Sequence, residues 1–150
     1  MGRAGLAFMI RSMLVALDDS PRATTVLRVA DQLARTFGAK VHLFQVVDIP
    51  PEFPASAHTE RDDLEEVLLR RARAALVATA VDMAGVDVDV AVCGGSSPWR
   101  LVVAKADSVG VDLIVIGSHG FGGLDHLLGT NAGRIADRAH HHVFVVHDGG

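Results

Sequence analysis

The chain has 150 residues, of which 49% are hydrophobic and 21% are charged, and its formal net charge is −4 at pH 7. These values predict one folded domain and exclude a disordered protein. Lys and Arg are spread along the sequence, so we expect no nucleic-acid partner. The sequence has no apolar run near the ~18 residues of a membrane span and no signal peptide, so we expect a cytoplasmic protein without a membrane partner. We expect residues 1–11 to be disordered.

Short apolar runs alternate with longer segments of helical periodicity, which predicts repeated β-α units on a parallel sheet. We expect strands over residues 13–17, 41–47, 86–92, 113–116 and 143–146. The first helix should be capped by Ser20 and end before Gly38, and the third should begin at Ser97 and end before Gly110. The last helix is expected over residues 131–139. The apolar stripe of the first helix should face the core: Val26, Leu27, Ala30, Leu33, Ala34 and Phe37.

The connection over residues 48–59 contains three prolines, at positions 50, 51 and 54. Proline removes a backbone donor and is excluded from helix interiors and from inner strands. We therefore interpret this connection as a long loop that could serve as a lid.

Two of the predicted strands differ in pattern. Valine alternates with Asp or Ala over residues 86–92, which is typical of a sheet edge, whereas residues 113–116 are continuously apolar, which is typical of a sheet centre. With right-handed crossovers, these positions predict a doubly wound α/β fold: one five-stranded parallel sheet of order 3-2-1-4-5 with helices on both faces. The winding reverses between strands one and four, and ligands of such sheets bind at that switch point.

A glycine-rich segment, GSHGFGGLDHLLGTN over residues 117–131, follows the predicted fourth strand. Glycines let the backbone approach a ligand, and the helix that opens at Gly129-Thr130 favours an anion at its N-terminus. The segment is not a P-loop, because the chain has no Gly-Lys pair, and Asp125 replaces the third glycine of the dinucleotide fingerprint. A nucleophile elbow around Ser118 would need glycine where Ile116 stands. His119 could donate to a phosphate or be an exposed loop histidine.

This segment and VALDDS, residues 15–20, resemble the universal stress protein family over about residues 13–147. ATP-binding members carry G-x2-G-x9-G-[ST], which Gly117, Gly120, Gly129 and Thr130 match, except that eight residues rather than nine separate the second and third glycines. The resemblance implies binding of ATP, AMP or another adenine nucleotide, with Mg²⁺.

Matching by position implies further nucleotide contacts. Asp18 would lie beside the adenine and ribose, while Ala16 and the backbone of Val46 would line the base pocket. No catalytic or metal-binding residue is expected. The predicted nucleotide-binding residues are Ala16, Asp18, Ser20, Val46, Gly117, His119, Gly120, Gly129, Thr130 and Asn131.

Other chemistries fit the sequence less well. Asp18-Asp19 would suit a receiver domain, but that site also needs an Asp closing strand three and a Lys closing strand five, where the chain has Cys93-Gly94 and His147. His140 to His142 are consecutive and point in different directions, which favours a solvated turn over a metal site. Cys93 is interpreted as a small apolar residue, and Trp99 as a cover for the sheet or a partner contact.

Three functions remain open at this point: a non-catalytic ATP-binding regulator, which we favour, a nucleotide-independent interaction protein, and a slow ATP hydrolase. A homodimer is expected through residues 143–146, which are apolar on both sides and carry no Lys or Pro to protect an edge strand. The family resemblance implies the same strand pairing across a two-fold axis.

Overall fold

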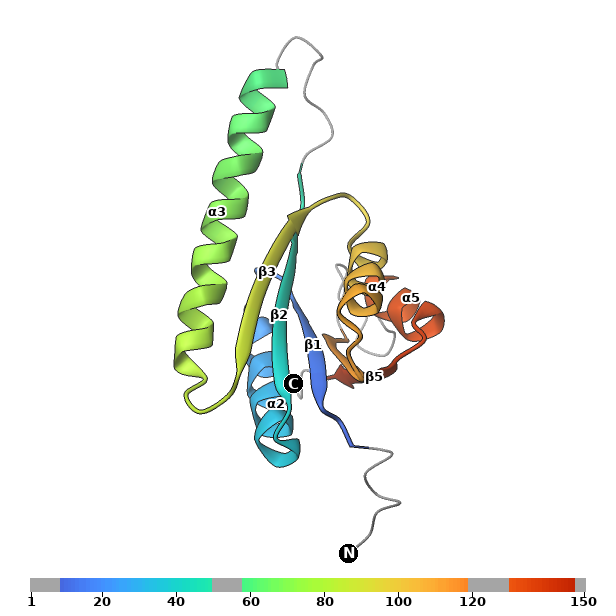
Figure 1. Ribbon diagram of the computed structural model, residues 1–150. Coiled ribbons are helices and arrows are strands. Elements are labelled where there is room, and N and C mark those ends of the chain that lie inside the picture. The colour runs from blue at the N-terminus through green and yellow to red at the C-terminus, as the bar shows by residue number, and fades with distance from the viewer. Residues whose placement is uncertain (1–8, 50–57, 119–129, 148–150) are drawn as a thin grey trace, which may run out of the picture.

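The computed structural model describes residues 9–49, 58–118 and 130–147, without the side chains of residues 58–62. Five parallel strands form one sheet of order β3-β2-β1-β4-β5, which confirms the predicted fold (Figure 1). The strands are β1 (Ser12–Leu17), β2 (Lys40–Val47), β3 (Val88–Gly94), β4 (Leu113–Gly117) and β5 (His142–Val146). The helices are α2 (Ala23–Phe37), α3 (His58–Asp82), α4 (Pro98–Val109) and α5 (Thr130–Arg138).

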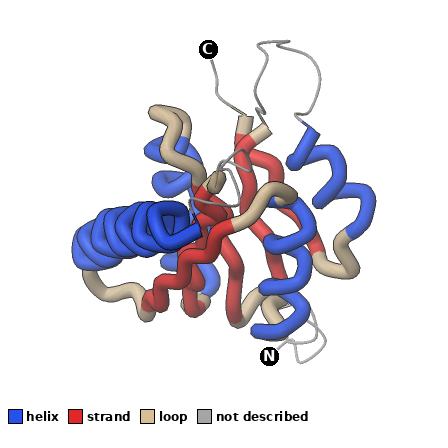
Figure 2. The backbone as a smooth tube through the Cα atoms, turned by 90° about the horizontal axis from the view of Figure 1, so that it is seen from above, coloured by secondary structure: helices blue, strands red, loops and turns tan. Residues whose placement is uncertain are grey.

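The helices cover both faces of the sheet (Figure 2). Residues of α2 and α3 pack with one face in a first core, and residues of α4 and α5 pack with the other face in a second core. The inner strands therefore bury both of their faces, and this explains their continuous apolar sequence. Fully buried side chains from β1 and β4 are Met13, Leu14, Val15, Ile114 and Val115.

The start of α2 differs from the sequence prediction. The helix begins at Ala23, and Ser20 does not cap it; instead, the Ser20 amide and hydroxyl donate to Asp18 Oδ1 at 2.9 and 2.6 Å. The serine is held in a tight turn because its amide and hydroxyl both donate to the carboxylate of Asp18, two residues earlier, instead of the hydroxyl accepting from the first amides of α2. The end of α2 agrees with the prediction, since Gly38 is left-handed, with φ of 65°.

Phe37 was expected in the buried stripe of α2, but it is 40% exposed. The stripe itself exists, because Val26, Ala30 and Ala34 are buried. Phe37 is in the last turn of α2, near the amino-terminal end of β2, which begins at Lys40. The sheet therefore offers this side chain little to pack against.

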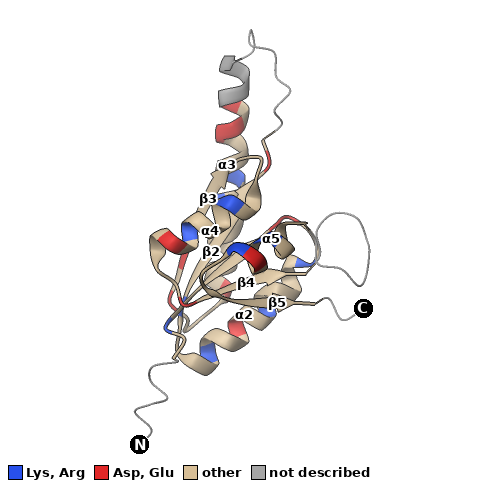
Figure 3. Ribbon diagram, turned by 90° about the vertical axis from the view of Figure 1, so that its right-hand side faces the viewer, with Lys and Arg blue, Asp and Glu red and all other residues tan. Residues whose placement is uncertain are grey.

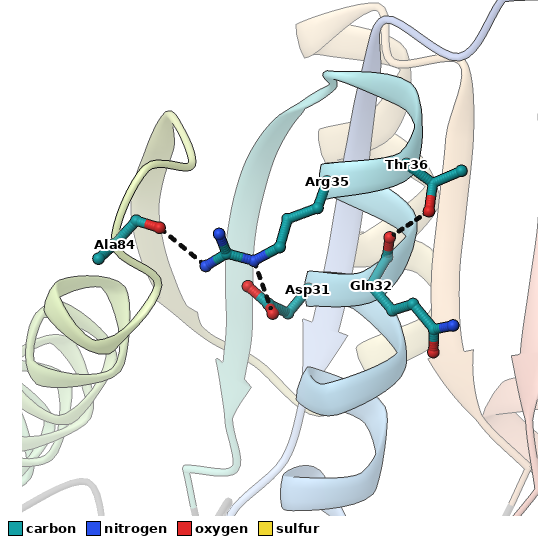
Figure 4. A network of polar contacts seen from close by, with 5 residues as sticks. All are labelled: Asp31, Gln32, Arg35, Thr36 and Ala84. Carbon is teal, nitrogen blue, oxygen red and sulfur yellow. Dashed lines mark hydrogen bonds and ion pairs between the residues drawn. The ribbon is translucent and has the colours of Figure 1, made fainter.

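A polar network joins α2 to the turn that follows α3 (Figure 4). The Arg35 guanidinium donates from Nε to Asp31 Oδ2 at 3.0 Å and from Nη2 to the Ala84 carbonyl at 2.8 Å. Thr36 Oγ1 donates to the Gln32 carbonyl at 2.8 Å. These groups are exposed, so the network orients two neighbouring segments rather than supplying much stability.

The two sheet edges differ in polarity, as the sequence patterns of their strands predict. At the β3 edge, Asp89 is exposed and its Oδ2 lies 3.1 Å from Lys40 Nζ. At the opposite edge, Phe144 of β5 is 40% exposed. Among the described residues, no helix is long and apolar enough to cross a membrane.

Candidate functional site

A cavity of about 820 Å³ opens at the carboxyl ends of the strands, where the winding reverses between β1 and β4. The ends of β1, β2 and β4 form its floor, and the first turns of α4 and α5 form a wall. Doubly wound sheets place ligands at this point because the two loops diverge there. The volume lies within the range of small-molecule sites, roughly 300–1,000 Å³.

The structure brings together most of the residues predicted from the sequence. The cavity is lined by Ala16, Asp18, Ser20, Val46, Gly117, Thr130 and Asn131. His119, Gly120 and Gly129 lie outside the described residues. Ser118 and Thr130, the described residues that flank this segment in the sequence, both line the cavity.

Three carboxylates line the cavity at the loops that follow β1 and β2, together with Arg22 of the first loop. Asp18 and Asp19 come after β1, and Asp48 comes after β2. The Asp18 carboxylate already accepts the two bonds from Ser20 described above, which fix one of its oxygens. A carboxylate has acceptor capacity for further donors, so this end suits ligand hydroxyl and amino groups.

The wall formed by the first turns of α4 and α5 favours an anion. Both α4 and α5 begin there, and neither helix has an acidic residue in its first turn. The helix dipole attracts negative charge at such termini. In α4 the first amides are already used, since the Trp99 amide donates to Asn131 Oδ1 and the Arg100 amide to the Ser97 carbonyl, so α4 contributes mainly through its dipole. Arg100 and Arg134 also line this wall, and Figure 3 views the molecule from the side on which α4 and α5 lie.

Ser118 is a site residue that the sequence analysis missed. Its side chain is only 3% exposed and lines the cavity, and its amide donates to the Val146 carbonyl at 2.9 Å. The Oγ atom has no hydrogen-bond partner within the described part of the chain. Leaving a buried hydroxyl unpaired costs free energy, so such a group in a cavity wall indicates a place for a ligand atom.

Arg100, Arg134 and Trp99 also line the cavity without having been predicted as site residues. The sequence feature that could have pointed to this wall is Ser97-Pro98, which marks the start of α4 and therefore a helix N-terminus at the carboxyl edge of the sheet. Trp99 packs against the second core, as a cover for the sheet would.

Cys93 and His141 do not line the cavity. Cys93 lies in β3 and packs against the second core, and burial raises the pKa of its thiol. His141 Nδ1 lies 3.7 Å from Asp107 Oδ1. In the described ranges, no three His, Cys, Asp or Glu side chains gather in a way that could hold a metal ion.

Residues 9–147 match the sequence model of the universal stress protein family. The chain belongs to this family. It is 29% identical over 130 residues to universal stress protein A homolog 1 of Coxiella burnetii, covering 83% of this chain and 88% of that protein. Among solved structures, the universal stress protein UspA from Lactobacillus plantarum superimposes with a TM-score of 0.80 at 20% identity, covering 91% of this chain and 97% of that one.

A second similar solved structure contains a bound ligand. It is a universal stress protein in complex with cAMP, with a TM-score of 0.63 and 26% identity, covering 93% of this chain and 98% of that one.

Proposed function

We propose that this universal stress protein is a non-catalytic regulator that binds ATP in the cavity at the carboxyl edge of the sheet. The observation that carries the proposal is the division of the cavity into an acidic end and an anion-favouring wall. A nucleotide has the matching polarity, with hydroxyl and amino donors at the nucleoside and negative oxygens at the phosphates. The cAMP complex of a similar protein supports an adenine nucleotide as the ligand.

The individual contacts follow from this orientation. The base would lie against the apolar side chains of Ala16, Val46 and Ile116, and the ribose beside Asp18. The phosphates would meet Ser118 Oγ and the first turn of α5 at Thr130. Because the described residues offer no cluster of three metal ligands, Mg²⁺ would be held mainly by the phosphates and water.

Fast ATP hydrolysis is not expected from this arrangement. Backbone N–H groups and a helix dipole bind the ground state and the transition state about equally, which gives affinity without rate. A hydrolase also needs a group that orients the attacking water. The carboxylates that line the cavity follow β1 and β2, and the first turns of α4 and α5 carry none.

The test is a calorimetric titration with ATP and Mg²⁺, followed by a steady-state assay of phosphate release. We expect saturable binding and turnover on the order of one per minute or slower. Absence of binding would favour a nucleotide-independent interaction protein. Phosphate release faster than about one per second, abolished in His119→Ala, would instead make the protein an enzyme.

The same proposal includes a homodimer in the cytoplasm, formed through β5. Phe144 supports it, because a 40% exposed aromatic side chain on an open edge strand is a suitable surface for a second copy.

The Ser118→Ala variant should separate stability from binding. Removing a buried hydroxyl that lacks a partner is expected to raise the free energy of unfolding of the nucleotide-free protein by about 1 kcal/mol. Removing a donor to a phosphate is expected to weaken ATP binding about fivefold. Chemical denaturation and calorimetry measure the two effects. A destabilised variant with unchanged affinity would show that the hydroxyl has a structural role only.

A further inference from the structure

Three arginine side chains surround the single tryptophan of the chain. The guanidinium carbons of Arg100, Arg134 and Arg138 lie 5.2, 5.6 and 5.8 Å from the centre of the Trp99 ring. Guanidinium groups within about 6 Å of an indole are attracted by its π-electrons. The cluster therefore gathers positive charge from α4 and α5 at one place.

The three arginines are not equivalent. Arg100 and Arg134 line the cavity, whereas Arg138 does not, and Arg138 Nε lies 3.4 Å from Asp137 Oδ2. Within the described residues, neither Arg100 nor Arg134 has a carboxylate in ion-pair distance. Two guanidiniums thus face the cavity with their charge still to be matched.

A hydrogen bond between the two helix starts keeps these arginines on one wall. The Trp99 amide donates to Asn131 Oδ1 at 3.3 Å, and this bond joins the first turn of α4 to the first turn of α5. Arg100 follows Trp99 directly, and Arg134 lies one helical turn after Thr130. Arg100 is thus in the first turn of α4 and Arg134 in the second turn of α5, and both line the cavity into which the N-terminus of α5 opens.

The geometry points to Arg100 and Arg134 as the residues that make the cavity select nucleotides by the length of their phosphate chain, with triphosphates favoured over monophosphates and cyclic monophosphates. This inference rests on the proposed function. A planar guanidinium can make two parallel hydrogen bonds to phosphate oxygens. Each phosphate beyond the first adds oxygens within reach of the arginines, whereas the single phosphate of AMP is already served by the helix N-terminus and Ser118.

Calorimetric titration of AMP, ADP and ATP at one fixed Mg²⁺ concentration tests the inference. The wild-type chain should bind ATP at least about tenfold more tightly than AMP. Arg100→Gln and Arg134→Gln should each weaken ATP binding about fivefold and AMP binding less than about twofold. The double variant should bind ATP and AMP with similar affinity. The advantage of ATP should also shrink as NaCl rises, because these side chains are exposed.

Arg138→Gln is the matched control, because it removes a guanidinium that also lies near the Trp99 ring but does not line the cavity. It should leave the preference for ATP unchanged. If the wild-type chain binds AMP and ATP with equal affinity, this inference is wrong while the proposed function stands. The same holds if Arg100→Gln and Arg134→Gln weaken the binding of both ligands equally. Absence of any nucleotide binding by the wild-type chain would instead overturn the proposed function.

Discussion

The Val145→Pro variant is expected to be a monomer at concentrations where the wild-type chain is a dimer. The Val146 carbonyl accepts the Ser118 amide at 2.9 Å, so the backbone of Val146 faces β4. Successive residues of a strand direct their backbone groups to opposite sides, and the Val145 amide therefore faces the open edge. Proline removes that donor. In a two-fold symmetric dimer both copies carry the substitution, so two donors are lost from the interface. The dimer dissociation constant should rise at least about a hundredfold.

Val145→Thr is the control, because it keeps the amide and a β-branched side chain in β5. Light scattering at tens of micromolar should show a dimer for the wild type and Val145→Thr and a monomer for Val145→Pro. Circular dichroism should show that the proline variant keeps its fold, since the β4–β5 ladder uses the residues on either side of it. A monomeric wild-type chain, or a dimeric Val145→Pro, would contradict pairing through β5.

The second large effect is expected from Gly129→Val, which should weaken ATP binding at least about tenfold while the protein stays folded. Gly129 directly precedes Thr130, the first residue of α5, whose N-terminus lies in the cavity wall. A phosphate bound by the first N–H groups of a helix needs close approach to the backbone there, and a branched side chain prevents it. Gly120→Val should act in the same direction, because it falls in the same motif.

Gly129→Ala provides a graded comparison, because its smaller side chain should cause a smaller loss. The affinities come from calorimetry, and thermal unfolding without nucleotide checks that each variant is folded. If both valine variants are folded and bind ATP like the wild type, the phosphates bind elsewhere.

Much of the fold was predictable because local patterns report directly on position in a parallel sheet. The alternation over residues 86–92 placed β3 at an edge, and the apolar run at 113–116 placed β4 at the centre; strand order then followed from crossover handedness. The errors concern ends of elements. Ser20 donates to Asp18 instead of capping α2, and Phe37 is exposed although it continues the apolar stripe of that helix. Helical periodicity does not show which local acceptor a serine uses or where the sheet beneath a helix ends.

The candidate site was predictable where it depends on backbone geometry. Glycines and helix starts identify a place where the chain meets a phosphate, and Gly117, Thr130 and Asn131 do line the cavity. Ser118, which follows β4, Arg100 of α4 and Arg134 of α5 meet only because their elements converge in space. The Ser97-Pro98 helix start is the one sequence feature that points toward this wall, and the spacing of the three residues does not reveal that they meet.

The hydrogen bond from the Ser118 amide to the Val146 carbonyl connects the cavity to the edge strand. Val146 belongs to β5 and also lines the cavity, so one residue is shared by the proposed nucleotide site and the strand proposed to join two copies. Thermodynamic linkage then makes the two equilibria reciprocal: by whatever factor a bound nucleotide changes the strength of the dimer, dimer formation changes the affinity for that nucleotide by the same factor. If the chain dimerises through β5 and that factor differs from one, the concentration of the protein becomes a variable in measurements of its nucleotide affinity.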